Sequence, residues 1–111
     1  MKRGEIVDNF KIIYKILKAL EAALDYEEFD VDEISHERLK ITYTRWVNIL
    51  IMLFENGYIT GISVRNMLGS KQPQIKINNL RITLKGLEYL QENSTLKKVG
   101  EIIKGIADIA T

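Results

Sequence analysis

Residues 42–90 read TYTRWVNILIMLFENGYITGISVRNMLGSKQPQIKINNLRITLKGLEYL, a pattern that predicts a helix, a β-hairpin and a second helix. Thr42 is a good N-cap, because its hydroxyl can accept a hydrogen bond from a free backbone N–H of the first turn. The helix is expected from about Tyr43 to Asn56, and Gly57 supplies its left-handed cap. Its buried face is expected to carry Trp46, Ile49, Leu50 and Leu53.

The hairpin is predicted from alternating apolar and polar residues along 58–65 and again along 74–78. The turn between them spans Asn66 to Pro73, which includes the only proline of the chain. Asn78-Asn79 is expected to interrupt the return strand before Leu80-Arg81-Ile82. Thr83 then caps the second helix. The apolar stripe of that helix is Leu84, Leu87 and Leu90.

The segment before Thr42 predicts two more helices. The first begins at an N-cap, Asp8 or Asn9, and its expected core residues recur at spacings of three and four. They are Phe10, Ile13, Leu17, Leu20 and Leu24, with Ile12 and Ile16 widening the stripe. An acidic connector over residues 26–32 follows, for which a short strand is one interpretation. Residues 35–40 predict a short second helix with an exposed His36.

Length and composition describe an ordinary domain without the groups of a catalytic site. A chain of 111 residues, 46% hydrophobic and 28% charged, is expected to form one domain with an apolar core. There is no cysteine and only one histidine, His36, so a metal site is not expected. Neither a nucleophile–base pair nor a glycine-rich phosphate loop is recognisable, so we expect no enzyme activity and no cofactor.

Hydropathy argues against insertion in a membrane. The longest apolar run, residues 49–54, is far too short to cross a bilayer. Lys11, Lys15 and Lys18 interrupt the apolar residues near the N-terminus, which argues against a signal-peptide core. The lack of disulfides fits a reducing compartment, so we expect a cytoplasmic protein.

The net charge of +1 hides a strong segregation along the chain. Residues 1–37 contain five basic and ten acidic side chains, net −5, and residues 86–111 are net −1. Residues 38–85 contain eight basic side chains and one acid, Glu55, net +7. A polyanion responds to the local potential of such a patch more than to the total charge. We therefore expect double-stranded DNA as the partner of this stretch.

The order helix, short helix, turn, helix, hairpin, helix is that of a winged helix-turn-helix. The predicted α+β fold has a three-helix core, a basic β-hairpin wing and two C-terminal helices. In helix-turn-helix docking, the second helix of the pair lies in the major groove and its N-terminal residues reach base edges. The expected recognition residues are Tyr43, Thr44, Arg45 and Asn48.

These residue types suit DNA recognition. Arginine can pair bidentately with guanine and asparagine with adenine, while threonine and tyrosine can contact phosphates or a thymine methyl group. Phosphate or wing contacts are expected from Arg38, Lys40, Arg65, Lys71, Lys76 and Arg81. Trp46 could stack on bases, but its position in the apolar stripe favours a core role.

Two signatures carry a resemblance to a known family. Residues 54–62 read FENGYITGI, and residues 80–93 read LRITLKGLEYLQEN. Together with the terminal helix rich in lysine and isoleucine, they resemble the YjcQ-like winged-helix family of Firmicutes and their phages, over roughly residues 41–108. The one departure is Arg81-Ile82 before Thr83, where the family pattern has a single leucine. The resemblance implies a bacterial or prophage winged-helix protein and brings no catalytic residues.

The C-terminal residues predict a separate helix. We expect a winged helix-turn-helix domain over residues 1–93 and a helix over 94–111 that could dimerise. Its apolar seam, at coiled-coil spacing, is Leu96, Val99, Ile103 and Ile106. An apolar stripe that would be exposed on a monomer favours a homodimer. The alternative is that this helix folds back on the first helix and completes the core.

The sequence as a whole predicts a small transcriptional regulator that binds double-stranded DNA. The inference from fold to function is an analogy, so a second class of function is kept. The alternative is a winged-helix module for protein–protein interaction, without sequence-specific DNA binding, whose basic face meets an acidic protein.

Overall fold

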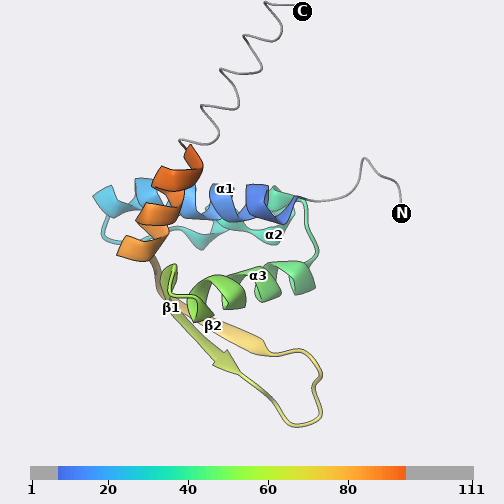
Figure 1. Ribbon diagram of the computed structural model, residues 1–111. Coiled ribbons are helices and arrows are strands. Elements are labelled where there is room, and N and C mark those ends of the chain that lie inside the picture. The colour runs from blue at the N-terminus through green and yellow to red at the C-terminus, as the bar shows by residue number, and fades with distance from the viewer. Residues whose placement is uncertain (1–7, 95–111) are drawn as a thin grey trace, which may run out of the picture.

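The computed structural model describes residues 8–94 and shows an α+β fold (Figure 1). The helical elements are α1 (Asn9–Ala22), η2 (Ala23–Asp25), η3 (Val31–Ile34), α2 (His36–Leu39) and α3 (Tyr43–Glu55), of which η2 and η3 are 3₁₀ helices. A two-stranded antiparallel sheet, β1 (Ile59–Arg65) and β2 (Gln74–Ile82), precedes a helix over residues 84–94. The hairpin projects from the helical body, an arrangement compatible with a winged helix.

The two ends of α3 are fixed by local hydrogen bonds, as the sequence predicted. The Thr42 hydroxyl accepts a hydrogen bond from the backbone N–H of Arg45 at 3.1 Å. At the other end, Gly57 adopts a φ of 81° and the N–H of Tyr58 donates to the Leu53 carbonyl at 2.9 Å. This is the Schellman arrangement that a left-handed glycine permits. The predicted bounds of α3 are therefore confirmed to within one residue.

The buried face of α3 forms the centre of the core. It consists of Trp46, Val47, Ile49, Leu50 and Leu53, so the four predicted core residues are confirmed. The indole N–H of Trp46 donates to the carbonyl of Ile34 at 2.8 Å. A buried indole needs such a partner, and this bond joins α3 to the end of η3. Trp46 is therefore a core residue and not a stacking platform.

The predicted face of α1 was wrong at both ends. Asp8 caps the helix as expected, but Phe10 is 72% exposed and Leu24 is 49% exposed. The buried residues of α1 are Ile12, Ile16, Leu17 and Leu20. Apolar residues surround much of this helix, so periodicity alone did not determine which side faces α3.

The connector between α1 and α2 differs from its prediction. It contains no strand within residues 26–32, and Val31–Ile34 form the 3₁₀ helix η3. The carboxylate of Asp30 caps η3 by accepting from the N–H of Asp32 at 3.0 Å. His36 is only partly exposed, because its ring packs edge-on against Tyr43 with the centroids 5.6 Å apart.

A bulge bends the hairpin near its base. Thr60 pairs with Arg81 but Ile62 pairs with Ile77, so three residues of β2 lie opposite the single residue Gly61. β2 is thus continuous through Asn78-Asn79, and the predicted interruption is instead this bulge. Gly61 has a φ of 94°, and a Cβ there would lie 2.3 Å from the carbonyl oxygen of Asn79. The base of the hairpin can therefore pack into the core while its distal half projects.

The helix over residues 84–94 begins as predicted. The Thr83 hydroxyl accepts from the N–H of Gly86 at 3.1 Å, and Leu90 is buried. Leu84, predicted on the buried stripe, is 73% exposed. Residues 95–111, which contain all but the first residue of the predicted terminal helix and its whole dimer seam, lie outside the described residues. Over residues 8–94, no helix has the length and apolar character needed to span a membrane.

Candidate nucleic-acid interface

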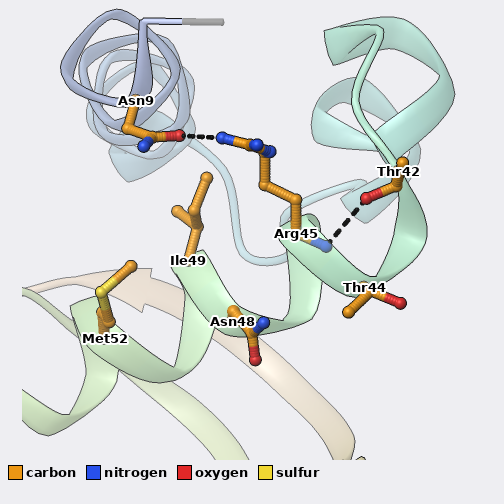
Figure 2. Close-up of a pocket in the computed structure, with 7 residues that line it drawn as sticks. All are labelled: Asn9, Thr42, Thr44, Arg45, Asn48, Ile49 and Met52. Carbon is orange, nitrogen blue, oxygen red and sulfur yellow. Dashed lines mark hydrogen bonds between the residues drawn. The ribbon is translucent and has the colours of Figure 1, made fainter. Parts of the chain in front are cut away.

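The four predicted recognition residues are exposed on the first turns of α3. Thr44, Arg45 and Asn48 line a hollow of about 370 Å³ (Figure 2). The other lining residues are Asn9, Thr42, Ile49 and Met52. Tyr43 is 51% exposed and lines a neighbouring hollow of about 280 Å³, on the side of the hairpin loop. The start of α3 thus presents polar side chains to two adjoining concave surfaces.

Arg45 reaches from α3 to the start of α1. Its Nη1 donates to Oδ1 of Asn9 at 2.9 Å, a contact drawn in Figure 2. A guanidinium carries five N–H donors in a planar fork, so this one bond leaves donors for another partner. The sequence predicted Arg45 but not the contact with Asn9, because 36 residues separate the two and no local pattern relates them.

The loop of the hairpin returns to α3. The Thr44 hydroxyl donates to Oε1 of Gln72 at 3.3 Å. The hollow beside Tyr43 is lined by that residue together with Ser70, Gln72, Pro73, Gln74 and Ile75. We call the helix–wing surface the exposed start of α3 (residues 43–48) together with hairpin residues 65–76. Ser70 and Gln72 were not predicted as members of the site, because neutral polar residues in a turn carry no distinctive signal.

Most of the predicted cations lie on or beside this surface. Arg65, Lys71 and Lys76 are exposed on the hairpin. Lys40 is exposed in a left-handed conformation, with a φ of 58°, at the junction of α2 and α3. The only acid of residues 38–85, Glu55, lies at the opposite end of α3. Lys40 therefore lies beside the recognition residues, whereas Arg65, Lys71 and Lys76 lie on the hairpin, whose loop contacts the start of α3 through Gln72.

Arg38 differs from the other predicted cations because it has an acidic neighbour, Asp32. It lies on α2, where its Nη2 is 3.7 Å from a carboxylate oxygen of Asp32. Both side chains are largely exposed, and such pairs contribute little to stability. The guanidinium can therefore exchange Asp32 for a phosphate at small cost.

The structure separates Arg81 from the other predicted contacts. Arg81 lies at the base of β2, and its guanidinium donates to the carbonyl of Ala23 at 3.2 Å and to the carbonyl of Glu27. These bonds tie the hairpin to the segment after α1, so we leave Arg81 out of the helix–wing surface. Lys85 also lies elsewhere, with its ammonium 5.3 Å from the ring centroid of Tyr58.

Other hollows within residues 8–94 also carry charged side chains, among them one of about 340 Å³ on α1 that is lined by Lys11, Lys15 and Lys18. Within residues 8–94, no three His, Asp or Glu side chains are arranged to hold a metal ion. Over the same residues, every buried side-chain nitrogen or oxygen has a hydrogen-bond partner. We take the helix–wing surface as the candidate site because it combines the predicted recognition residues with the cations of the hairpin.

Comparison with known protein families identifies a match over most of the chain. A family model described as YjcQ protein matches residues 14–109, which is most of the chain. No curated protein and no solved structure matches the chain significantly.

Proposed function

The chain belongs to the YjcQ protein family, and on that premise we propose that it is a small winged helix-turn-helix regulator that binds double-stranded DNA. In this proposal α2 and α3 are the helix-turn-helix pair and the β1–β2 hairpin is the wing. The family match confirms the resemblance carried by the two sequence signatures. An origin in Firmicutes or their phages, and a role in transcription, remain parts of the proposal.

One observation carries the proposal: the exposed start of α3 and the basic wing form a single surface. The hydrogen bond between Thr44 and Gln72 joins the two elements. In helix-turn-helix proteins, the start of the second helix faces base edges while neighbouring groups contact the backbone. The helix–wing surface offers both kinds of group, which supports this mode of docking.

Base reading is assigned to Arg45 and Asn48. Both are exposed and line the same hollow at the start of α3. Arginine matches the two acceptors of guanine and asparagine matches the donor and acceptor of adenine in the major groove. Asn9 holds the Arg45 guanidinium in the free protein. Guanine would accept hydrogen bonds from the guanidinium N–H groups that do not bond to Asn9.

Backbone contacts are assigned to the cations around these two residues. Lys40 and Arg38 flank the start of α3, and the wing carries Arg65, Lys71 and Lys76. Each phosphate that a cation neutralises releases condensed counterions, which makes binding favourable and dependent on salt. The acidic connector meets the hairpin at its base, through Arg81 and Glu27. The negative charge of the connector repels DNA at the base of the hairpin and so orients the duplex toward the distal wing.

The proposal assigns no catalytic role to the chain and is tested by site selection. A random duplex library is bound to the protein, and the selected sequence then competes with a scrambled duplex of equal length. A regulator enriches one motif and binds it more tightly than the scrambled competitor. Equal binding of both duplexes would favour the alternative, an interaction module without sequence-specific DNA binding.

A matched pair of variants locates the surface in the same assay. Arg45→Ala removes one positive charge from the helix–wing surface, and Lys15→Ala removes one from the exposed side of α1. Arg45→Ala is expected to lose the preference at one position of the selected motif, whereas Lys15→Ala is expected to select the motif unchanged. Equal effects of the two variants would contradict the placement of the interface.

A further inference from the structure

The tip of the wing is apolar, although cations flank it. Leu68 is 105% exposed and Met67 is 48% exposed. Arg65 precedes them and Lys71 follows them, and both of these cations are also exposed. Two large apolar side chains in water at the end of a projecting hairpin are a feature that neither the core nor the basic surface explains.

The tip is a defined turn. The N–H of Ser70 donates to the carbonyl of Met67 at 3.1 Å, which closes a four-residue turn with Leu68 at its first central position. Gly69, at the second central position, has a φ of 81°, a conformation that favours glycine. Leu68 therefore occupies the corner of the turn, pointing away from the protein.

Further hydrogen bonds hold this turn relative to α3. The Ser70 hydroxyl donates to the carbonyl of Gln72 at 2.9 Å, and the side chain of Gln72 accepts from Thr44. Pro73 follows and restricts the backbone. These contacts bring the turn that carries Leu68 close to the start of α3 in the sequence of bonded residues 44, 72 and 70.

We propose that Met67 and Leu68 form a wedge that enters the minor groove next to the major groove occupied by α3, separates two base pairs and bends the duplex. Leucine and methionine are among the side chains that partly unstack base steps in this way. Arg65 and Lys71 would contact the phosphates on either side, which accounts for the apolar tip between two cations. The inference rests on the proposed function and adds a mode of binding to it.

Pyrimidine–purine steps are the easiest to kink, so a TA or CA step is expected at the position that the wing reaches. The duplex enriched by site selection is therefore labelled at its ends for resonance energy transfer, and 2-aminopurine is placed in turn at each step flanking the motif. Bending brings the end labels closer together. Unstacking of one step raises the fluorescence of 2-aminopurine at that step.

The test compares the wild type with Leu68→Ser, with Lys71→Ala as the control. The wild type is expected to bend the duplex and unstack one step. Leu68→Ser is expected to bind about tenfold more weakly, about 1.4 kcal/mol, with a straight duplex and an unchanged dependence on salt. Lys71→Ala is expected to keep the bend and to reduce the salt slope by about one. Leu68→Ala, which changes only the size of the wedge, is expected to lose most of the bend.

Three results would overturn the inference, and they differ in whether the proposed DNA-binding function falls with it. Wild-type binding to a straight duplex, with no 2-aminopurine signal, would remove the wedge and leave the proposed function standing. No binding of any duplex would remove both. In the third result, the wild type binds phosphatidylserine vesicles, Leu68→Ser loses this binding, and Leu68→Ser still bends DNA. That result would assign the tip to a lipid surface.

Discussion

Arg45 shows how single residues connect the fold to the proposed function. Its backbone N–H completes the cap of α3 with Thr42, and its guanidinium crosses to Asn9 of α1. Thr42 could be predicted as a cap because capping involves neighbours in sequence. Asn9 could not be predicted as a partner, because the contact depends on how two distant helices pack.

Base reading by α3 predicts specific losses of preference. Arg45→Ala or Asn48→Ala is expected to cost about 1–3 kcal/mol at one base position, because a bidentate contact discriminates between bases by that amount. Binding to a panel of duplexes, each with one base pair of the selected motif changed, measures this loss. Lys76→Ala is the control and should weaken every duplex alike. Unchanged base preferences for Arg45→Ala would place the recognition face elsewhere.

Substitution of Trp46 is predicted to lower the stability of the protein and not to remove a contact with DNA. Its side chain is 7% exposed, and its indole N–H satisfies the carbonyl of Ile34. Trp46→Ala is expected to lower the free energy of unfolding by about 3–5 kcal/mol, as measured in urea. Trp46→Phe keeps an aromatic ring and should cost less. A native emission maximum as red as that of the unfolded chain would contradict burial of the indole.

Among the elements, α3 was predictable and the face of α1 was not. A cap at Thr42 and a glycine at position 57 define the ends of α3 locally, and Trp46, Ile49, Leu50 and Leu53 recur between them at helical spacing. α1 carries apolar residues on several sides, so the buried face depends on packing against α3 and β2. The return of the hairpin loop to Thr44 was missed for a similar reason, since periodicity does not reveal a contact between residues 28 positions apart.

The bulge predicts that adding one methyl group at Gly61 strongly destabilises the protein. Gly61→Ala is expected to destabilise the protein by more than about 3 kcal/mol, because a strained φ is combined with a clash against the backbone of Asn79. Gly69→Ala is the matched control, since its φ is also positive but a Cβ there meets nothing within 4 Å. It should cost only about 1–2 kcal/mol. Equal losses for the two variants in urea unfolding would contradict the close packing at Gly61.

At the scale of the whole molecule, charge segregation was evident in the sequence, but its arrangement needed the fold. Eight basic residues over residues 38–85 predicted a basic face. The structure gathers Lys40, Arg65, Lys71 and Lys76 near the start of α3 or on the wing. It places Arg81 and Lys85 in other contacts. Spacing along the chain could not separate these two groups, because the separation depends on contacts between residues far apart in the sequence.

The oligomeric state remains a prediction from the sequence of residues 94–111. We propose a homodimer through the seam of Leu96, Val99, Ile103 and Ile106, because helix-turn-helix proteins commonly bind paired half-sites as dimers. Size exclusion with light scattering is expected to give a dimer at micromolar concentration, which Ile103→Glu converts to a monomer. A wild-type monomer, unchanged by that substitution, would remove the dimer from the proposal.

The central claim, that the helix–wing surface binds duplex DNA, is tested most directly by fluorescence anisotropy of a labelled duplex at several salt concentrations. We predict that log affinity falls linearly with log salt, by about 0.9 for each phosphate contacted. The triple variant Arg65→Ala/Lys71→Ala/Lys76→Ala should reduce that slope by up to about three. A control with Lys11→Ala/Lys15→Ala/Lys18→Ala, which removes the same charge from α1, should keep the slope. No binding at low salt, or equal slopes for the two triple variants, would contradict the account.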